Sequence, residues 1–106
     1  MKMILGLLAF ALAGAALAQT PTGNAEAAKA KTSMCEGCHA VPGYRTAYPR
    51  VYRVPKIGGQ QPLYLVNALQ AYKSGARSHP TMQAIAQGLS EQDMADLAAY
   101  YSSLQK

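Results

Sequence analysis

The pentapeptide Cys35-Glu36-Gly37-Cys38-His39 is the most informative stretch of this 106-residue sequence. Two cysteines three positions apart, with a histidine directly after them, are typical of covalent haem attachment. The two thiols add across the haem vinyl groups, and the adjacent imidazole coordinates the iron from the same side. This spacing suits an irregular turn at the end of a helix. We therefore expect Cys35 and Cys38 to hold one haem c through thioether bonds, and His39 to be the proximal iron ligand.

Three other roles for the cysteines fit the rest of the chain less well. A thioredoxin-type Cys35–Cys38 disulfide belongs to a fold in which strands and helices alternate, and no such alternation is visible. A structural zinc site usually needs four Cys or His ligands, whereas this chain offers two cysteines with His39 and His79. A plain disulfide between residues so close together closes a very small loop and stabilises little.

The N-terminus has the pattern of a secretory signal peptide. Lys2 precedes an uncharged run of apolar and small residues from Met3 to Ala18, which ends in Ala16-Leu17-Ala18. This run is shorter than the roughly 20 residues that span a bilayer, although an uncleaved anchor is the other interpretation. We expect cleavage after Ala18. No second apolar run of spanning length follows, so the sequence predicts an exported protein without stable membrane insertion.

The composition of the predicted mature chain favours a small domain built around a cofactor. Cleavage after Ala18 leaves 88 residues, which suffice for one domain only. Phe10 leaves with the signal, so the remaining aromatic residues are seven tyrosines, and a haem would replace the missing large side chains. Nine Lys and Arg residues remain against five acids, a net charge of +4. These charges are too dispersed for nucleic-acid binding, but they suit weak docking onto acidic partner proteins.

Helical patterns cover most of the mature chain and predict an all-α domain. Residues 19–23 are expected to be a flexible lead-in, and the domain is expected to occupy residues 24–106. Asn24 can cap a first helix that runs to about Cys35. Pro62 and Gly75 suit the two ends of a helix over 61–74.

The C-terminal half also contains the best-marked helix of the chain. Ser90 and Asp93 resemble a capping box, and Leu97, Tyr100, Tyr101 and Leu104 form its apolar face. A loop over 76–81 is expected to lead to Met82, with a short helical turn over 83–87. Residues 40–59 have no helical or strand period and are expected to form a long loop, for which wrapping a haem edge is a suitable role.

The ring of His39 needs a partner that fixes its tautomer and plane. Histidine ligands usually donate their second ring N–H to a carbonyl or a carboxylate. Pro55, which opens Pro55-Lys56-Ile57-Gly58-Gly59-Gln60, is our candidate for that carbonyl. The simpler interpretation is that Pro55 only stiffens the loop before the Gly-Gly bend.

Met82 is the best candidate for the second axial ligand. Met34 is tethered beside Cys35 on the proximal side, and Met94 lies near the start of the last helix, where core packing is expected. Met82 follows His79-Pro80-Thr81 in a predicted loop, and loops often carry ligands. His79 is an alternative that would make a bis-histidine site, and an open sixth position is another. Ligation by His39 and Met82 would leave no vacancy for a substrate, and a thioether ligand raises the reduction potential.

These motifs together resemble class I c-type cytochromes. The resemblance rests on the CxxCH motif, Pro55-x-Ile57-Gly58-Gly59-Gln60, Tyr72-Lys73-x-Gly75-x-Arg77, Met82 in the following segment, and a C-terminal Ala-Ala-Tyr-Tyr helix. It covers the chain from about Asn24 to Leu104, and it is similar to small bacterial monohaem cytochromes and to one half of dihaem periplasmic ones.

The resemblance implies a small class I cytochrome c fold, with three to five helices wrapped around one covalently bound haem. It implies thioethers at Cys35 and Cys38, axial ligation by His39 and Met82, and the Pro55 carbonyl as the partner of His39. It also implies that the N- and C-terminal helices cross. The sequence departs from the family between Val41 and Val54, which is unusually rich in Tyr and Arg. Residues 44–53 and Arg77 are candidates for propionate contacts or for a basic docking face, or else form an ordinary solvated surface.

The expected function is that of a periplasmic single-electron carrier, which acts as a monomer with redox partner proteins and is not an enzyme. The alternative is a haem c subunit docked permanently on a larger flavin- or metal-containing dehydrogenase or oxidase. A third possibility, a haem catalyst or ligand sensor, would require an open iron position.

Overall fold

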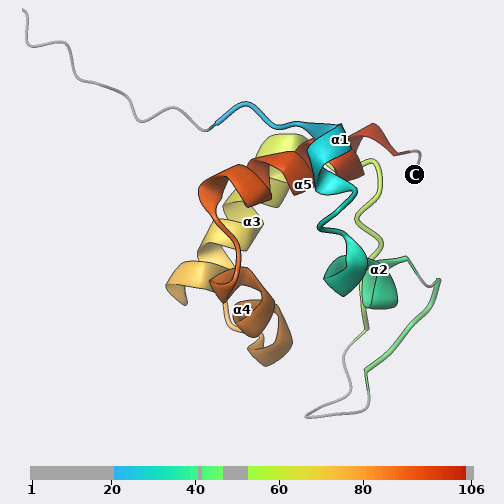
Figure 1. Cartoon of the computed structure of the whole chain (residues 1–106). Helices are drawn as coiled ribbons and strands as arrows, with labels where there is room; N and C mark the ends of the chain where they lie inside the picture. The colour runs from blue at the N-terminus through green and yellow to red at the C-terminus, as the bar shows by residue number, and fades with distance from the viewer. Residues whose placement is uncertain (1–20, 41, 47–52, 105–106) are drawn as a thin grey trace, which may run out of the picture.

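The computed structural model describes residues 21–40, 42–46 and 53–104. This part of the chain contains five α-helices and no strand (Figure 1). An isolated antiparallel bridge joins Arg45 and Arg53. The helices are α1 (Ala25–Ala28), α2 (Ser33–His39), α3 (Pro62–Ser74), α4 (Pro80–Gln87) and α5 (Glu91–Ser103). The expected all-α fold with three to five helices is confirmed.

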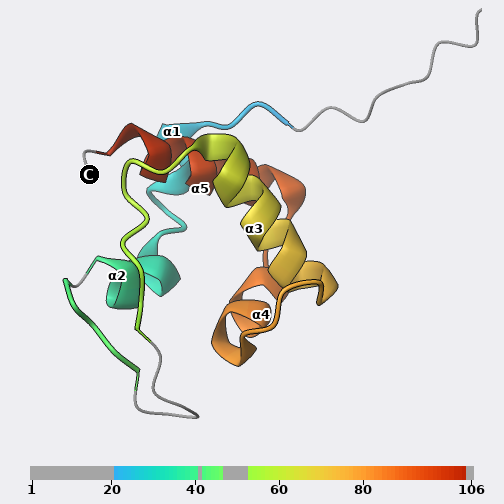
Figure 2. The same cartoon turned by 180° about the vertical axis from the view of Figure 1, so that it is seen from behind.

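Helix α5 lies at the centre of the arrangement and packs against both α1 and α3, while α4 packs against α3. Figures 1 and 2, which show opposite sides of the molecule, both place α2 on one flank and α4 on the other. The core lies between α1, α3 and α5. Its buried residues are Ala28, Leu65, Val66, Leu89, Met94, Leu97, Ala98 and Tyr101.

Helix α3 has the ends that its sequence predicts. Pro62 occupies the first turn, where its missing N–H costs nothing, and Gly75 ends the helix in the left-handed conformation at φ 84°. A residue with a Cβ would be strained at that angle, so glycine fits the helix end. Leu65 and Val66 are buried on the side that faces α5.

Helix α5 begins with a complete capping box. The Ser90 hydroxyl accepts from the Asp93 N–H at 3.0 Å, and the Asp93 carboxylate accepts from the Ser90 N–H at the same distance. Two N–H groups that lack a partner within the helix are thereby satisfied. Met94 is only 1 % exposed, as expected for a core position.

The expected single helix from Asn24 to about Cys35 is wrong, because the chain turns between Ala28 and Ser33. Asn24 does cap α1, accepting from the Ala27 N–H. After Ala28 the backbone tightens, since Lys31 N–H donates to the Ala28 carbonyl at 2.7 Å, three residues back. Thr32 is buried at 5 % exposure and precedes α2. The turn directs the Lys31 side chain toward α5.

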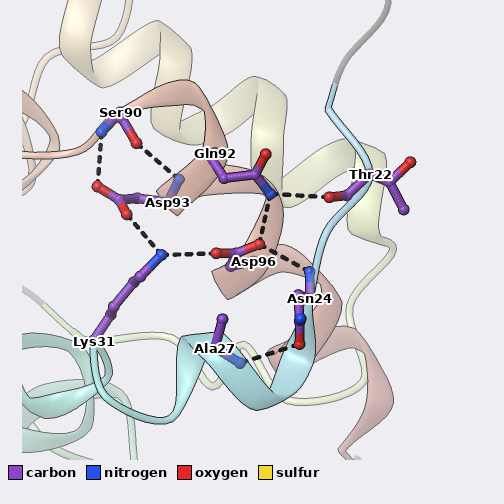
Figure 3. Close-up of polar contacts among 8 residues, drawn as sticks. All are labelled: Thr22, Asn24, Ala27, Lys31, Ser90, Gln92, Asp93 and Asp96. Atoms are coloured by element: carbon purple, nitrogen blue, oxygen red, sulfur yellow. Dashed lines mark hydrogen bonds and ion pairs between the residues drawn. The ribbon is translucent and has the colours of Figure 1, made fainter.

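A polar network fastens this turn and the preceding segment to α5 (Figure 3). Lys31 Nζ lies 2.7 Å from Asp96 Oδ2 and 2.8 Å from Asp93 Oδ1. The other Asp96 oxygen accepts from the Asn24 N–H and from the Gln92 side chain, both at 2.8 Å. The hydrogen bond from Lys31 holds the pKa of Asp96 down to about 2. The buried carboxylate is therefore charged and fully partnered, as a buried charge must be.

Contacts with α5 begin before Asn24. Gln92 Nε2 donates to the Thr22 carbonyl at 2.9 Å. Gly23 lies so close to α5 that a Cβ at this position would be 2.1 Å from the Ala95 carbonyl oxygen. The segment before α1 therefore touches α5 at this glycine, and α1 itself packs against α5.

The connection between α2 and α3 has no helix in its described residues, 42–46 and 53–61. Val54 N–H donates to the Tyr44 carbonyl at 3.0 Å, and Gly59 N–H donates to the Tyr101 carbonyl at 2.8 Å. The first hydrogen bond joins two described parts of this connection to each other, and the second attaches the end of the connection to α5. Tyr48, Arg50 and Tyr52, and the predicted signal peptide, lie outside the described residues. In the described part of the chain, no helix is both long and apolar enough to cross a membrane.

Candidate haem site

Two adjoining cavities open between α2, α3, α4, α5 and the loop before α3. Their volumes are about 220 Å³ and 340 Å³. Seven residues line both cavities, so the two form one continuous site, and most of these residues carry apolar or soft side chains. They are Cys35, His39, Pro55, Tyr72, Arg77, Met82 and Ile85.

Helix α2 supplies the cysteine pair and the histidine from one wall of this site. Both cysteines and His39 lie within α2 (Ser33–His39), not on an irregular turn at a helix end as the spacing suggested. Cys35 and Cys38 are half-buried and are not joined by a disulfide. Burial raises the pKa of the Cys35 thiol. Within the described residues, no group of three or more His, Cys, Asp or Glu side chains could hold a metal ion.

The His39 ring is oriented by a backbone carbonyl from the opposite loop. His39 Nδ1 lies 2.7 Å from the Pro55 carbonyl oxygen, the contact that the sequence predicted. Because a carbonyl can only accept, Nδ1 carries a proton, and in the neutral ring Nε2 then keeps its lone pair. Proline has no N–H of its own, so its carbonyl is its single backbone hydrogen-bonding group.

Met82 faces the cavities from α4, on the other flank of the site. The sequence predicts Met82 in a loop before a helical turn that starts near Gln83. Instead, Met82 lies in the first turn of α4, which begins at Pro80. The reason is a cap that the sequence reading missed: His79 Nδ1 accepts from the Met82 N–H at 3.2 Å. Pro80 directly after this residue is the signal that could have revealed the helix start.

Arg77 and Tyr72 form a further part of the wall. The Arg77 guanidinium carbon lies 4.9 Å above the centre of the Tyr72 ring, a cation–π contact. The edge of His79 meets the same ring, with 6.4 Å between the ring centres. Thr46 and Arg53 also line the larger cavity, which places these two members of the Tyr- and Arg-rich connection at the site.

Tyr101 provides a test of what the cavity can hold. Its hydroxyl is buried and has no hydrogen-bond partner in the described part of the protein. Burial raises the pKa of Tyr101, and the neighbouring Cys35 raises it further. This buried hydroxyl lies beside the Cys35 thiol in an apolar cavity that His39 also lines, so the cavity combines apolar walls with the thiol and the imidazole that a covalently bound haem needs. The residues present fit a haem.

A helical shell around an apolar cavity, with CxxCH on one wall, defines a protein that carries covalent haem. The sequence model of the family described as Cytochrome c matches residues 13–105. The chain belongs to this family.

Known relatives agree with this assignment. Cytochrome c-554(548) of Halomonas halodenitrificans is 40% identical over 84 residues, which cover 76% of this chain and 96% of the relative. Cytochrome c4 of Pseudomonas aeruginosa is 37% identical over 97 residues, which cover 92% of this chain but only 45% of the relative. The cytochrome subunit of sulfide dehydrogenase from Chlorobaculum tepidum is 31% identical, over 68% of this chain and 61% of the subunit.

A solved structure shares the fold. The crystal structure of reduced recombinant cytochrome c4 from Pseudomonas stutzeri superimposes with a TM-score of 0.64 at 35% identity, over 79% of this chain and 47% of that chain. The chain thus spans nearly all of one relative and less than half of the cytochromes c4.

Family membership and the site together confirm the expected cofactor and class of function. The CxxCH residues Cys35, Cys38 and His39 indicate one covalent haem c. Membership of the cytochrome c family supports electron transfer as the class of function, in line with the cytochromes to which the chain is similar.

Proposed function

We propose that this protein is a single-electron carrier whose haem iron has His39 and Met82 as axial ligands. One observation carries the proposal: His39 and Met82 project from helices on opposite flanks and line the same two cavities. Cys35 and Cys38 lie on the His39 side, where they would hold the haem covalently. When bound, the haem supplies the one-electron redox chemistry, and a thioether ligand favours its Fe(II) state.

The hydrogen bonds around the site support the proposed roles of His39 and Met82. The Pro55 carbonyl occupies His39 Nδ1, so Nε2 is available as a ligand atom. His79, the rival for the sixth position, uses its Nδ1 to cap α4 through the Met82 N–H. Through this contact, His79 caps the helix turn that carries Met82. A filled sixth position suits electron transfer, because no bond to the metal then has to form or break.

Absorption spectra of Met82→Ala beside the wild type test the ligand assignment. We expect the weak long-wavelength sulfur-to-iron band of the ferric protein to be present in the wild type and lost in the variant. Met34→Leu is the matched control, because Met34 also lines the larger cavity but is 55% exposed, and it should keep the band. If the wild type lacks the band, the assignment is wrong and His79→Ala becomes the variant to examine.

The proposed redox partners present acidic docking surfaces. The predicted mature chain has a net charge of +4, and the basic residues Lys56, Arg53 and Arg77 line the site. Attraction between opposite charges accelerates encounters and is screened by salt over roughly 8 Å at physiological ionic strength. Electron-transfer rates with an acidic partner should therefore fall as salt is added. A rate that is independent of ionic strength would contradict this part of the proposal.

The proposed location is the periplasm, after removal of residues 1–18. The apolar run that ends in Ala16-Leu17-Ala18 supports it. The mass of the exported holoprotein tests the cleavage site, because processing after Ala18 leaves Gln19 as the first residue. A mass that includes the first 18 residues would show that the segment is retained.

The alternative function, a haem subunit of a larger oxidoreductase, is favoured by the likeness to a cytochrome subunit of sulfide dehydrogenase. Native mass after mild extraction separates the two functions. A free carrier should elute at the mass of one chain, whereas a subunit should co-elute with a flavin- or metal-containing chain.

A further inference from the structure

Helix α4 carries Met82, packs on α3 and buries few of its own residues against the rest of the protein. All eight residues of α4 are described, and only Ala86 among them is buried. Met82 and Ile85 face the cavities. In contrast, six residues of α5 are buried. Polar contacts between α3 and α4 add to the packing of the two helices.

Two crossed hydrogen bonds, which we call the α3–α4 clamp, supply such contacts. The Lys73 side chain donates to the Leu89 carbonyl at 2.5 Å, beyond the end of α4. In the opposite direction, the Gln87 side chain donates to the Lys73 carbonyl at 2.8 Å, in the last turn of α3. Each residue thus contributes a side chain to one of these bonds, and Lys73 takes part in both.

The clamp uses groups that helix ends leave available. The last four carbonyls of a helix have no acceptor role within it, and the Lys73 carbonyl belongs to this set in α3 (Pro62–Ser74). The Leu89 carbonyl follows the Gly88 cap of α4. The Lys73 ammonium is a favourable cation at both places, because the C-terminal end of a helix carries partial negative charge. Charged donors also make stronger hydrogen bonds than neutral ones.

We infer that Lys73 and Gln87 are positioning residues for Met82, which they hold against the cavity by fixing the tilt of α4 on α3. This inference rests on the proposed role of Met82 as an iron ligand. The clamp joins the far end of α4, and Met82 lies in its first turn. A helix of eight residues is roughly 12 Å long and moves as one rigid piece. A change of tilt at the Gln87 end therefore displaces Met82 at the other.

Competition by imidazole measures this effect directly. Free imidazole binds the ferric protein only when Met82 has left its position, so the apparent affinity reports the population of the open form. Both Lys73→Met and Gln87→Met remove the donor; methionine matches the length of glutamine and is one atom shorter than lysine. Gln87→Met should tighten imidazole binding about fivefold, which corresponds to the roughly 1 kcal/mol net contribution of one hydrogen bond, and Lys73→Met should tighten it at least as much because it removes a charged donor. Absorption titrations at 25 °C give the affinity.

Two further variants make the test specific. Lys73→Arg keeps a charged donor and should restore an affinity close to that of the wild type. Lys29→Met is the matched control, because Lys29 is an exposed lysine on the α1 side of the molecule that pairs with Glu26 at 2.9 Å. It should leave imidazole binding unchanged. Thermal unfolding of every variant confirms that the titration is done on folded protein, and Gln87→Met serves if Lys73→Met does not fold.

The outcomes separate this inference from the proposed function. If the wild type lacks the sulfur-to-iron band, Met82 is not the ligand and both fail. If the wild type has the band but the Lys73 and Gln87 variants bind imidazole as the wild type does, the clamp has no positioning role. Equal tightening in Lys29→Met would also overturn the inference, because the effect would then follow from charge alone.

Discussion

Replacement of Gly23 by alanine should lower the free energy of unfolding by about 3 kcal/mol, although the change adds only one methyl group. The new Cβ would lie 2.1 Å from the Ala95 carbonyl oxygen and 2.9 Å from the Ala99 Cβ. Ordinary Cβ contacts begin at 3.4 Å, so the first distance is too short by about 1.3 Å and the second by about 0.5 Å, and the segment must move away from α5. Such overpacking costs about 1–3 kcal/mol by itself.

The movement also stretches the hydrogen bonds that flank Gly23. These are the bonds from Asn24 N–H to Asp96 at 2.8 Å and from Gln92 to the Thr22 carbonyl at 2.9 Å. Each contributes about 0.5–1.5 kcal/mol. Alanine also restricts the unfolded chain, which offsets only about 0.4–1 kcal/mol. For a domain of this size, a net loss of about 3 kcal/mol lowers Tm by roughly 12–24 °C.

Thermal unfolding of the ferric holoprotein, followed by far-UV circular dichroism, measures this loss. Gly88→Ala is the matched control. Gly88 has φ −84°, and a Cβ there would meet only the Ile85 carbonyl oxygen at 3.6 Å, an ordinary contact. The control should change stability by less than about 1 kcal/mol in either direction. A Gly23→Ala protein as stable as the wild type, or a control that is equally destabilised, would refute the reasoning.

Two more predictions concern α5. The pKa of Asp96 in the folded protein is about 2, below its ordinary value of 3.8, so the unfolded chain binds more protons as the medium becomes acidic. The contribution of Asp96 to the free energy of unfolding should be complete above pH 4 or so and should be lost as the pH falls toward about 2. Over this pH range, the urea midpoint should fall less steeply with decreasing pH in Asp96→Asn than in the wild type. The same pH dependence in both proteins would contradict the prediction. Ser90→Ala removes the helix cap and should cost about 1 kcal/mol in urea unfolding. Ser103→Ala, which only loses a bond to the Tyr100 carbonyl in the last turn, should change stability by less than about 0.5 kcal/mol, and equal losses would exclude a specific capping effect.

Elements with local signals were predictable from the sequence. The ends of α3 follow from Pro62 and Gly75, and the start of α5 follows from Ser90 and Asp93, because each residue acts on backbone groups within one turn of itself. The haem attachment motif is equally local, since five consecutive residues carry the whole chemistry.

Elements that depend on distant partners were predicted less well. The break between α1 and α2 was missed because Lys31 and Thr32 do not stop a helix by themselves. What favours the turn is an ion pair from Lys31 to Asp96, 65 residues away. The start of α4 was misplaced because His79 is not among the strongest capping residues, yet it accepts from the Met82 N–H.

By itself, the sequence determined the chemistry of this protein: CxxCH indicates covalent haem because two thiols and an imidazole at that spacing suit one macrocycle, whatever surrounds them. Only the tertiary structure decided how the site is assembled. His39 and the Pro55 carbonyl are 16 residues apart and meet at 2.7 Å, and Met82 reaches the cavity from a helix that packs on α3. These arrangements depend on which helices pack together, and packing is set by the whole folded chain.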